Sequence, residues 1–373
     1  MKIICLIDMD YFFAACEELR KPEFKEKSIA VVTDTSREGS KGVIMTCNYN
    51  ARKFGVRSGM PASVGLNLCK DLLLIKEDFK FYEEKSKEVF EIVKGFSSKV
   101  EQVSVDEAYV EISDKVSSYE QALSYAKQIK ETITSKTKLP CTIGVGVNKL
   151  ISKMACDAAK PNGLKLVKHE EAKEFLSKLP VGKLYGVGEK TKERLEAMNI
   201  KTVGELASTN KMLLMEHLGN SMGLELYNYA NGIDESDVIT EYETKSIGRE
   251  RTLKKDTTNE EDVLPIIKEL SKDVIEEAKK EGYLFKIITV KMRYNDFSDH
   301  LKSKTIKPSN NIDDLQKIAI ELFKRYINKE KPLRKVGVRI SSLSKGTKQK
   351  GLLLSLLQNL IKDIFLQIFF LIH

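Results

Sequence analysis

One stretch restricts the possible folds of this chain more than any other. Residues 103–112 are rich in β-branched and aromatic side chains, which is typical of a buried strand, yet two adjacent carboxylates, Asp106 and Glu107, interrupt them. Adjacent strand residues point to opposite faces, so we expect both acids in a tight turn between two strands. A buried charge needs a partner, and the stretch contains no Lys or Arg. The pattern therefore favours a divalent cation as that partner.

A second acidic pattern follows an apolar segment at the N-terminus. Residues 3–7 are apolar and lead directly to Asp8 and Asp10. Two such strands can lie side by side in one sheet and bring their acids together. Ligands that are all oxygen, without Cys or His, favour Mg²⁺. In the alternative interpretation Asp10 caps the next helix and Glu107 is a solvated turn residue, but the two motifs together, with the aromatic residues after Asp10, favour the metal site.

The basic residues are unevenly distributed. The net charge is +8, and residues 245–345 contain 24 Lys and Arg against 16 Asp and Glu, so this segment holds the whole surplus of 8. A basic segment beside a neutral remainder indicates a polyanionic partner, most simply a nucleic acid backbone. The alternative is a solvated surface rich in Lys and Glu, as in thermophilic proteins.

The cysteines and histidines exclude several kinds of site. The six cysteines show no C-x-x-C spacing, so we expect reduced thiols in a cytoplasmic protein rather than disulfides or a zinc site. The four histidines do not cluster, which argues against an imidazole base. Asp8 and Asp10 interrupt the apolar N-terminus, so we expect no signal peptide.

Hydrophobic periodicity predicts the same order of elements twice, strand–helix–strand–strand–helix–strand. In the first half this order indicates a ferredoxin-like sheet. It has strands at 3–7, 100–105, 108–112 and 141–147 and helices at 79–97 and 119–136. Residues 166–232 are helical throughout, and 233–244 form an acidic linker. The order returns in the basic segment, at 245–253, 260–280, 284–293, 300–306, 312–327 and 336–340.

Three short motifs are suited to phosphate binding. Tyr49, Arg52 and Lys53 lie at i, i+3 and i+4 of a predicted helical turn, on one face. Lys160 follows a predicted helix at 149–159, which Pro161 and Gly163 end. The run from Gly186 to Gly188, followed by Lys190, resembles a helix-hairpin-helix, in which glycines and a helix N-terminus approach a phosphate.

The two acidic motifs together carry a family resemblance. Asp8-Met9-Asp10-Tyr11-Phe12-Phe13-Ala14 with Ser104-Val105-Asp106-Glu107-Ala108 resembles the Y-family DNA polymerases of the DNA polymerase IV, or lesion-bypass, type, over about residues 1–343. The resemblance implies a multidomain α+β right-hand polymerase. Its parts are a ferredoxin-like palm (1–10 and 78–165), small fingers (11–77), a helical thumb with the helix-hairpin-helix (166–232), a linker (233–244), a β-α-β-β-α-β little finger (245–341) and a tail (342–373).

The resemblance also assigns residues to roles. Asp8, Asp106 and Glu107, with the Met9 carbonyl, would hold two Mg²⁺ ions for attack of a primer 3′-hydroxyl on a dNTP. The nucleotide would be bound by Tyr11, Phe12, Phe13, Thr46, Tyr49, Arg52 and Lys160, with Phe13 excluding ribonucleotides. Primer–template DNA would be bound by Gly186, Gly188, Lys190, Lys245, Ser246, Arg249 and Arg251. The implied enzyme is a monomer of low fidelity and low processivity that performs translesion synthesis without a proofreading domain.

The apolar tail departs from the family pattern. Residues 352–372 have the length of a membrane helix, but Lys362 and Asp363 lie in the middle, so we expect no membrane span. Gln358, Ile361, Ile364 and Phe365 have the spacing of a sliding-clamp binding box, with Ile364 in place of its first aromatic residue. A frameshift near the end of the gene is the alternative origin of this tail.

Two other functions use part of the pattern. A nucleotidyl cyclase also has a ferredoxin-like palm with paired carboxylates, but needs neither a helix-hairpin-helix nor a basic terminal domain. A non-catalytic DNA-binding scaffold uses those two features, but does not need Asp8, Asp106 and Glu107.

Overall fold

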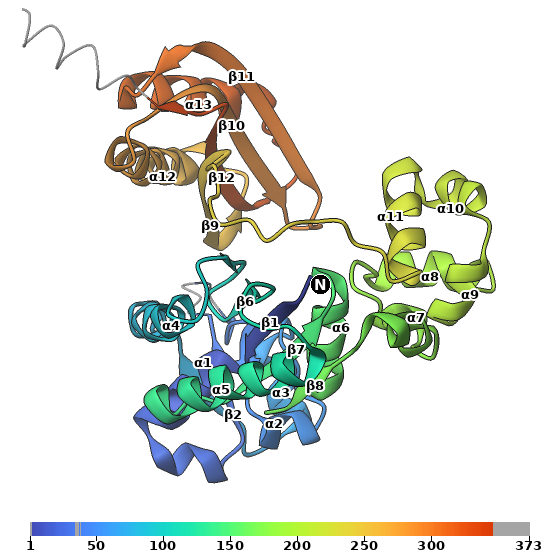
Figure 1. The fold of residues 1–373 in the computed structure, drawn as a ribbon. Helices are drawn as coiled ribbons and strands as arrows, with labels where there is room; N and C mark the ends of the chain where they lie inside the picture. Colours follow the sequence, from blue (N-terminus) through green and yellow to red (C-terminus); the bar gives the residue numbers. More distant parts are fainter. Residues whose placement is uncertain (1, 34–36, 38, 346–373) are drawn as a thin grey trace, which may run out of the picture. The chain divides into compact units, whose positions relative to one another are not determined.

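The computed structural model describes residues 2–33, 37 and 39–345, which form two compact units (Figure 1). The first unit comprises residues 2–33 and 41–242, and the second comprises residues 37, 39–40 and 243–345. The elements of the first unit are, in chain order, β1 (Ile4–Met9), α1 (Phe12–Arg20), η1 (Pro22–Glu26), β2 (Ile29–Val32), β3 (Ile44–Cys47), α2 (Tyr49–Lys53), α3 (Ala62–Leu68), β4 (Leu73–Lys76), α4 (Phe79–Lys94), β5 (Val100–Gln102), β6 (Glu107–Glu111), α5 (Tyr119–Thr137), β7 (Cys141–Gly146), α6 (Lys149–Ala159), β8 (Leu164–Leu166), α7 (His169–Ser177), η2 (Val181–Lys183), α8 (Glu189–Ala197), α9 (Val203–Ser208), α10 (Lys211–Leu218) and α11 (Asn220–Ala230).

The central sheet of the first unit has the strand order β5-β6-β1-β7-β8. Strand β1 lies between β6 and β7 and is antiparallel to both. Together with α4 and α5, the strands β1, β5, β6 and β7 have the sequence order and the spatial order of a ferredoxin-like fold. The predicted ferredoxin-like palm is therefore confirmed.

Both faces of β1 are covered by helices. Ile3, Cys5 and Ile7 belong to one core with side chains of α4 and α5, whereas Ile4 and Leu6 pack with Cys156 of α6. Successive strand residues point to opposite faces, so a strand that is buried on both sides must be apolar at every position. This burial explains the uninterrupted apolar run before Asp8.

The long helices begin where side chains cap them. Asp78, Ser118 and Asn148 precede α4, α5 and α6, and each side chain accepts a hydrogen bond from the N–H three residues later. Such caps satisfy N–H groups that have no partner inside the helix. Helix α6 ends at Ala159, just before Pro161, as the sequence predicts.

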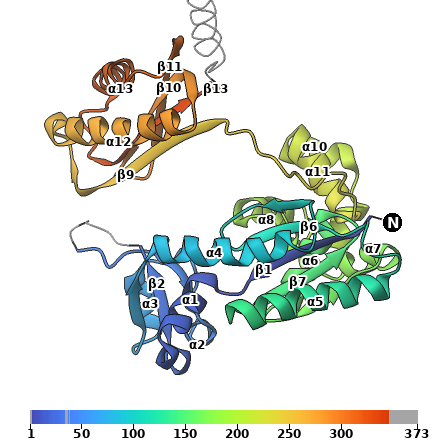
Figure 2. The same cartoon turned by 60° about the vertical axis from the view of Figure 1, so that its left-hand side comes forward.

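A smaller sheet with the order β3-β2-β4 lies at one end of the central sheet, and Figure 2 shows it with α2 and α3, away from α10 and α11. Asn48 connects it to α1, because its Nδ2 donates to Glu18 Oε1 (2.9 Å) while its Oδ1 accepts from Ala51 N (3.1 Å). Gly55, just after α2, has a φ of 86°, which is the left-handed conformation that favours glycine at a helix end.

The second unit contains one antiparallel sheet and two helices. Its elements are β9 (Ser246–Thr257), α12 (Glu260–Lys280), β10 (Tyr283–Tyr294), β11 (Asp299–Ser309), α13 (Ile312–Tyr326), β12 (Leu333–Ser341) and β13 (Ser344–Lys345). The sheet order is β11-β10-β12-β9, and α12 and α13 lie side by side on one face (Figure 1). The predicted β-α-β-β-α-β sequence is confirmed, but the strand order differs from that of the central sheet.

All six cysteines are buried free thiols. Among residues 2–33, 37 and 39–345, no helix has both the length and the apolar character needed to cross a membrane. The apolar stretch at 352–372 lies outside the described residues.

The segment after α11 contains no helix or strand over residues 233–245, as its composition predicts, yet it is attached to the central sheet as far as Tyr242. Glu101 of β5, only 3% exposed, is the main attachment. Its carboxylate accepts from Lys149 Nζ (2.8 Å), from Ile239 N (2.8 Å) and from the Tyr242 hydroxyl. The same segment reaches α6, because Asp234 Oδ2 accepts from Leu150 N (2.9 Å).

Replacing Glu101 should therefore loosen this segment. E101A leaves the partly buried Lys149 without its carboxylate partner, so we expect a loss of about 3 kcal/mol in unfolding free energy, typical of a broken buried ion pair, and faster proteolysis within 233–242. Burial raises the pKa of Glu101, but Lys149, Tyr242 and the Ile239 N–H outweigh it and lower the pKa. The stabilisation is thus present above the ordinary glutamate pKa and is lost as the pH falls through the lowered folded value.

Urea unfolding and limited proteolysis measure both effects. E91A, which changes an exposed glutamate of α4, is the matched control. Equal stability and equal cleavage for E101A and E91A would contradict the role of Glu101.

Candidate active site

The predicted acidic residues meet at one end of the central sheet. In the antiparallel register of β1 and β6, Asp8 lies opposite Glu107. One residue further, Met9 N donates to Asp106 O (2.8 Å), so the loop before β6 is fixed to the end of β1. The two acidic motifs, almost a hundred residues apart in sequence, thereby share one edge.

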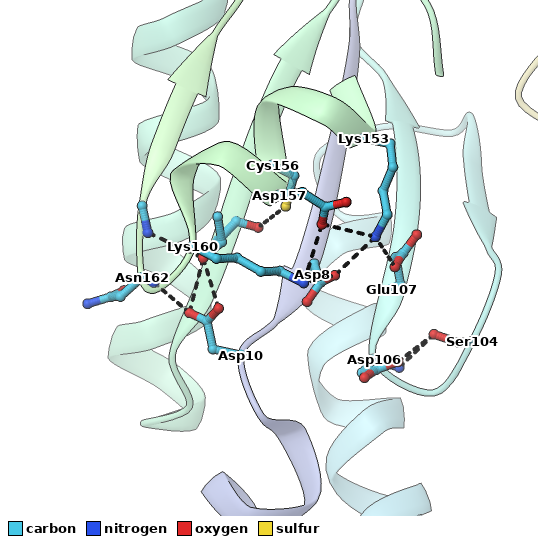
Figure 3. A network of polar contacts seen from close by, with 12 residues as sticks. Asp8, Asp10, Ser104, Asp106, Glu107, Lys153, Cys156, Asp157, Lys160 and Asn162 are labelled. Atoms are coloured by element: carbon cyan, nitrogen blue, oxygen red, sulfur yellow. Dashed lines mark hydrogen bonds and ion pairs between the residues drawn. The ribbon is translucent and has the colours of Figure 1, made fainter. Parts of the chain in front are cut away.

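The prediction that both Asp106 and Glu107 lie in a turn is wrong for Glu107. Strand β6 begins at Glu107, and only Asp106 lies in the loop. Because Glu107 already pairs with β1, the two side chains point in different directions (Figure 3). Asp106 Oδ1 accepts from Ser104 Oγ (2.5 Å), whereas Glu107 points toward α6.

Two lysines reach the carboxylates of Asp8 and Glu107 (Figure 3). Lys153 lies within α6, and Lys160 lies at its C-terminal end. Lys153 Nζ lies 2.9 Å from Glu107 Oε2 and 3.5 Å from Asp8 Oδ2, and Lys160 Nζ lies 2.6 Å from Asp8 Oδ2. Burial lowers the pKa of Lys153, but the charges of Glu107, Asp157 and Asp8 outweigh it and raise the pKa. The ammonium is therefore charged at neutral pH.

Sequence reasoning missed Lys153. A signal was available, because Lys153, Asp157 and Lys160 stand at i, i+4 and i+7, the spacing of one helix face. Burial raises the pKa of Glu107, and the Lys153 ammonium opposes that rise. The lysine is thus part of the electrostatic surroundings of the predicted metal ligands.

Asp10 anchors a loop and does not cap α1, so the capping interpretation is wrong. The residue before α1 is Tyr11, which makes no side-chain cap. The Asp10 carboxylate instead accepts from Thr142 Oγ1 (2.9 Å) and from Asn162 N (2.7 Å). Burial raises the pKa of Asp10, against the effect of these two hydrogen bonds. Asp10 therefore fixes the loop that follows Lys160.

A cavity of about 210 Å³ opens beside Asp8 and Asp106. It is lined by all seven residues predicted to bind the nucleotide, Tyr11, Phe12, Phe13, Thr46, Tyr49, Arg52 and Lys160, and also by Met9, Asp10, Met45 and Ser58. Met45, Ser58 and Asp10 were not predicted as part of such a site. Glu107 does not line the cavity, since its side chain faces Lys153.

The cavity has an aromatic and cationic wall. The rings of Tyr11 and Tyr49 pack edge to face with centroids 5.1 Å apart, and Arg52 lies over the Tyr49 ring at 4.9 Å. Arg52 Nε also donates to Cys47 O (3.2 Å), which holds the guanidinium at the cavity. Lys53 is exposed and is not part of the wall.

The two adjacent phenylalanines differ as their helical positions predict. Phe12 is 2% exposed and belongs to the core, whereas Phe13 is partly exposed. The Phe13 ring packs against Tyr82, with centroids 4.8 Å apart. Both residues are among those that line the cavity.

The predicted DNA-binding residues lie in two places. Gly186 has a φ of 88° and Gly188 precedes α8, whose first turn carries the exposed Lys190. In the second unit, Lys245 and Ser246 are exposed at the start of β9. Arg249 and Arg251 instead form ion pairs with Glu277 and Glu269 of α12. The predicted clamp-binding residues 358–365 lie outside the described residues.

The comparisons with known proteins decide the family. DNA polymerase IV 2 of Methanosarcina mazei is 37% identical over 353 residues, which cover 94% of this chain and 95% of the relative. The chain belongs to the Y-family DNA polymerases. DNA polymerase IV of Streptococcus thermophilus is 36% identical over 338 residues, covering 90% of this chain and 92% of that protein. This Y-family polymerase is thus similar to archaeal and bacterial enzymes alike.

Family models and solved structures agree with this membership. Residues 7–157 match the impB/mucB/samB family, residues 244–352 match its C-terminal domain, and residues 182–234 match the DNA polymerase-iota thumb domain. The Y-family DNA polymerase chimera Dbh-Dpo4(243-245)-Dbh has a TM-score of 0.85 and 30% identity, covering 92% of this chain and 100% of that chain. An insertion ternary complex of Dbh DNA polymerase matches with a TM-score of 0.67 and 29% identity over the same shares.

The activity of this Y-family polymerase is therefore DNA-directed DNA synthesis, with DNA and nucleotides as its partners. The cyclase and scaffold alternatives are wrong.

Family membership implies dependence on a divalent metal, and the all-oxygen donor set fits a hard cation. Within the described part of the chain, no three His, Cys, Asp or Glu side chains converge into a metal cluster. Asp8 and Glu107 are paired with lysines, whereas Asp8 and Asp106 line the same cavity.

Removing the Asp10 carboxylate should release the loop after Lys160. In D10A the Asn162 N–H and the Thr142 hydroxyl lose their acceptor, so we expect the Asn162 amide to exchange with solvent at least about tenfold faster. Hydrogen exchange measured by NMR or mass spectrometry tests this expectation. The exposed residue Asp114 supplies the control D114A, and unchanged exchange at Asn162 in D10A would show that another contact fixes the loop.

Proposed function

We propose that this polymerase has low fidelity and low processivity, extends primers past damaged template bases with two Mg²⁺ ions, and lacks 3′→5′ proofreading. The observation that carries the proposal is that Asp8 and Asp106 line the same cavity as Tyr49, Arg52 and Lys160. Carboxylates beside cationic and phenolic groups suit a metal-bound triphosphate. The division into palm, fingers, thumb, linker and little finger given above is part of the same proposal.

Each group has a role in transfer of a nucleotide to a primer. Asp8, Asp106 and Glu107, with the Met9 carbonyl, would hold the two ions, which stabilise the attacking and leaving oxygens when bound. Arg52 and Lys160 would neutralise the phosphates, and Tyr49 would donate a hydrogen bond to them. The primer 3′-hydroxyl attacks the α-phosphorus, and pyrophosphate leaves. The hydrogen bond from Asn162 N to Asp10 holds the loop after Lys160, whose Nζ lies 2.6 Å from Asp8 Oδ2.

The small finger elements support tolerance of damaged bases. Over the described part of residues 11–77, the longest helix is α1 with nine residues, while α2 and α3 contain five and seven. None of them is long enough to close over a whole base pair. A nascent pair of unusual shape would therefore meet little steric selection.

Primer extension across an abasic template site tests the proposal. We expect the wild-type enzyme to insert opposite and beyond the site in Mg²⁺, and to leave a mismatched 3′ end untrimmed. D106A should lose all measurable extension, because a ligand to the ions is missing, while its DNA affinity stays within about twofold. D114A is the control for a lost exposed carboxylate. An enzyme that stops at the abasic site, or a D106A variant that retains a tenth of the rate, would contradict the proposal.

Phe13 should exclude ribonucleotides. Phe13 lines the cavity and follows Asp8 by five residues, and a flat apolar ring there would leave no room and no hydrogen bond for a 2′-hydroxyl. F13A should raise the efficiency of rNTP incorporation by about a thousandfold while dNTP use changes little.

The neighbouring residue provides the control. F12A removes a core ring and should lower the melting temperature without admitting rNTPs. Steady-state kinetics with single dNTPs and rNTPs measure both variants. If F12A gains rNTP use and F13A does not, the gate has been assigned to the wrong ring.

The remaining proposals concern partners and location. We propose that the basic second unit supplies much of the DNA affinity, that the tail binds the replication sliding clamp through Gln358, Ile361, Ile364 and Phe365, and that the enzyme acts as a cytoplasmic monomer. The charge surplus supports the first proposal, the residue spacing supports the second, and the six free thiols are consistent with a reducing compartment.

A further inference from the structure

Helix α6 places one lysine, which does not line the cavity, against two predicted metal ligands. Lys153 Nζ is 2.9 Å from Glu107 Oε2 and 3.5 Å from Asp8 Oδ2, and its side chain is 13% exposed (Figure 3). The third partner is Asp157 Oδ1, at 3.4 Å. No step of the proposed mechanism uses this lysine.

Lys153 differs from the other two lysines of this helix and its end. Lys160 lines the cavity, and its side chain is 31% exposed, so it can contact a nucleotide. Lys149 is held by Glu101 on the far edge of the sheet. Lys153 does not line the cavity, is only slightly exposed, and forms ion pairs with Asp8, Glu107 and Asp157. Its position suits a permanent counter-charge.

We propose that Lys153 is a built-in cation that weakens divalent-metal binding to the free enzyme and orients the Glu107 carboxylate. This inference rests on the proposed function, because it takes Asp8, Asp106 and Glu107 as the metal ligands. The ammonium competes for the same carboxylate oxygens and repels a second positive charge a few ångströms away. Lys153 is thus a positioning residue.

The consequence is that metal binding depends on the nucleotide. A triphosphate brings several negative oxygens, which offset the ammonium and complete the ligand set. Without them, the carboxylates are already partly neutralised by Lys153 and Lys160. The enzyme therefore takes up its ions together with the dNTP and holds them weakly beforehand.

Direct titration with Mn²⁺ tests this role without any catalytic readout. The full-length protein, without DNA or nucleotide, is titrated while free Mn²⁺ is followed by electron paramagnetic resonance. By Coulomb's law, removing one unit charge that lies a few ångströms from a divalent ion changes the affinity for that ion about tenfold, even at the dielectric constant of water. We expect K153M to bind Mn²⁺ about tenfold more tightly than wild type. K153R, which keeps the charge, should remain near wild type.

A second variant should change Mn²⁺ affinity in the opposite direction. Asp157 lies 3.4 Å from Lys153 and 3.6 Å from Lys160 and partly offsets both charges, and its side chain is 43% exposed, so D157N should fold. D157N should bind Mn²⁺ several-fold more weakly. Thermal unfolding gives an independent readout, because Mn²⁺ should raise the melting temperature of K153M more than that of wild type.

D106A separates failure of this inference from failure of the proposed function. If D106A leaves Mn²⁺ binding unchanged, the proposed metal site is wrong. If D106A weakens binding but K153M binds no more tightly than wild type, or D157N no more weakly, then Lys153 is only a structural ion-pair partner and the proposed function stands.

Discussion

The pairing of β1 with β6 on one side and β7 on the other is the constraint on which the rest of the active site depends. It sets Asp8 opposite Glu107, ties Met9 to the loop of Asp106, and sets Asp8 opposite Thr142 on the other side. Because side-chain direction alternates along a strand, a shift of one residue would turn Asp8 into the core that holds Cys5 and Ile7. The apolar residues on both faces of β1 therefore fix the register that places Asp8 at the sheet edge.

The charges at this edge are arranged as a network of alternating sign. Asp8, Asp106 and Glu107 come from the strand ends, while Lys153 and Lys160 come from α6 and its C-terminal end, which is held in turn by Asp10. Burial raises the pKa of a carboxylate unless a nearby cation or a hydrogen-bond donor opposes the effect. The structure uses both, with ammonium groups beside Asp8 and Glu107 and N–H or O–H donors on Asp10. Burial still raises the pKa of Asp10, Asp106 and Glu107, and these partners oppose the rise at Asp10 and Glu107.

The two sheets show that an order of elements does not define a fold. The central sheet and the sheet of the second unit share the sequence β-α-β-β-α-β, yet the first strand pairs with the third and fourth in one, and only with the fourth in the other. Glycine supplies a local reason in the second unit. Gly337 lies opposite Glu250 and Gly248 opposite Arg339, and a Cβ on Gly337 would come within 2.7 Å of the Glu250 side chain. Glycine at these two positions thus leaves room for the long side chains opposite them.

The sequence by itself determined the local structure and the chemistry of the acids. Periodicity fixed α6 and α12 to the residue, Pro161 and Gly163 fixed where α6 ends, and the oxygen-only set of Asp8, Asp106 and Glu107 pointed to a metal before any fold was known. Only the tertiary structure decided that Glu107 begins a strand, that Asp10 holds the loop after Lys160, that Arg249 pairs with α12, and that Lys153 faces two of the acids. The physical reason is that periodicity and capping report interactions within a few residues, whereas an ion pair is chosen by packing. Lys153 and Glu107 are 46 residues apart, and they meet because α6 packs against β7 and β1 of the same sheet.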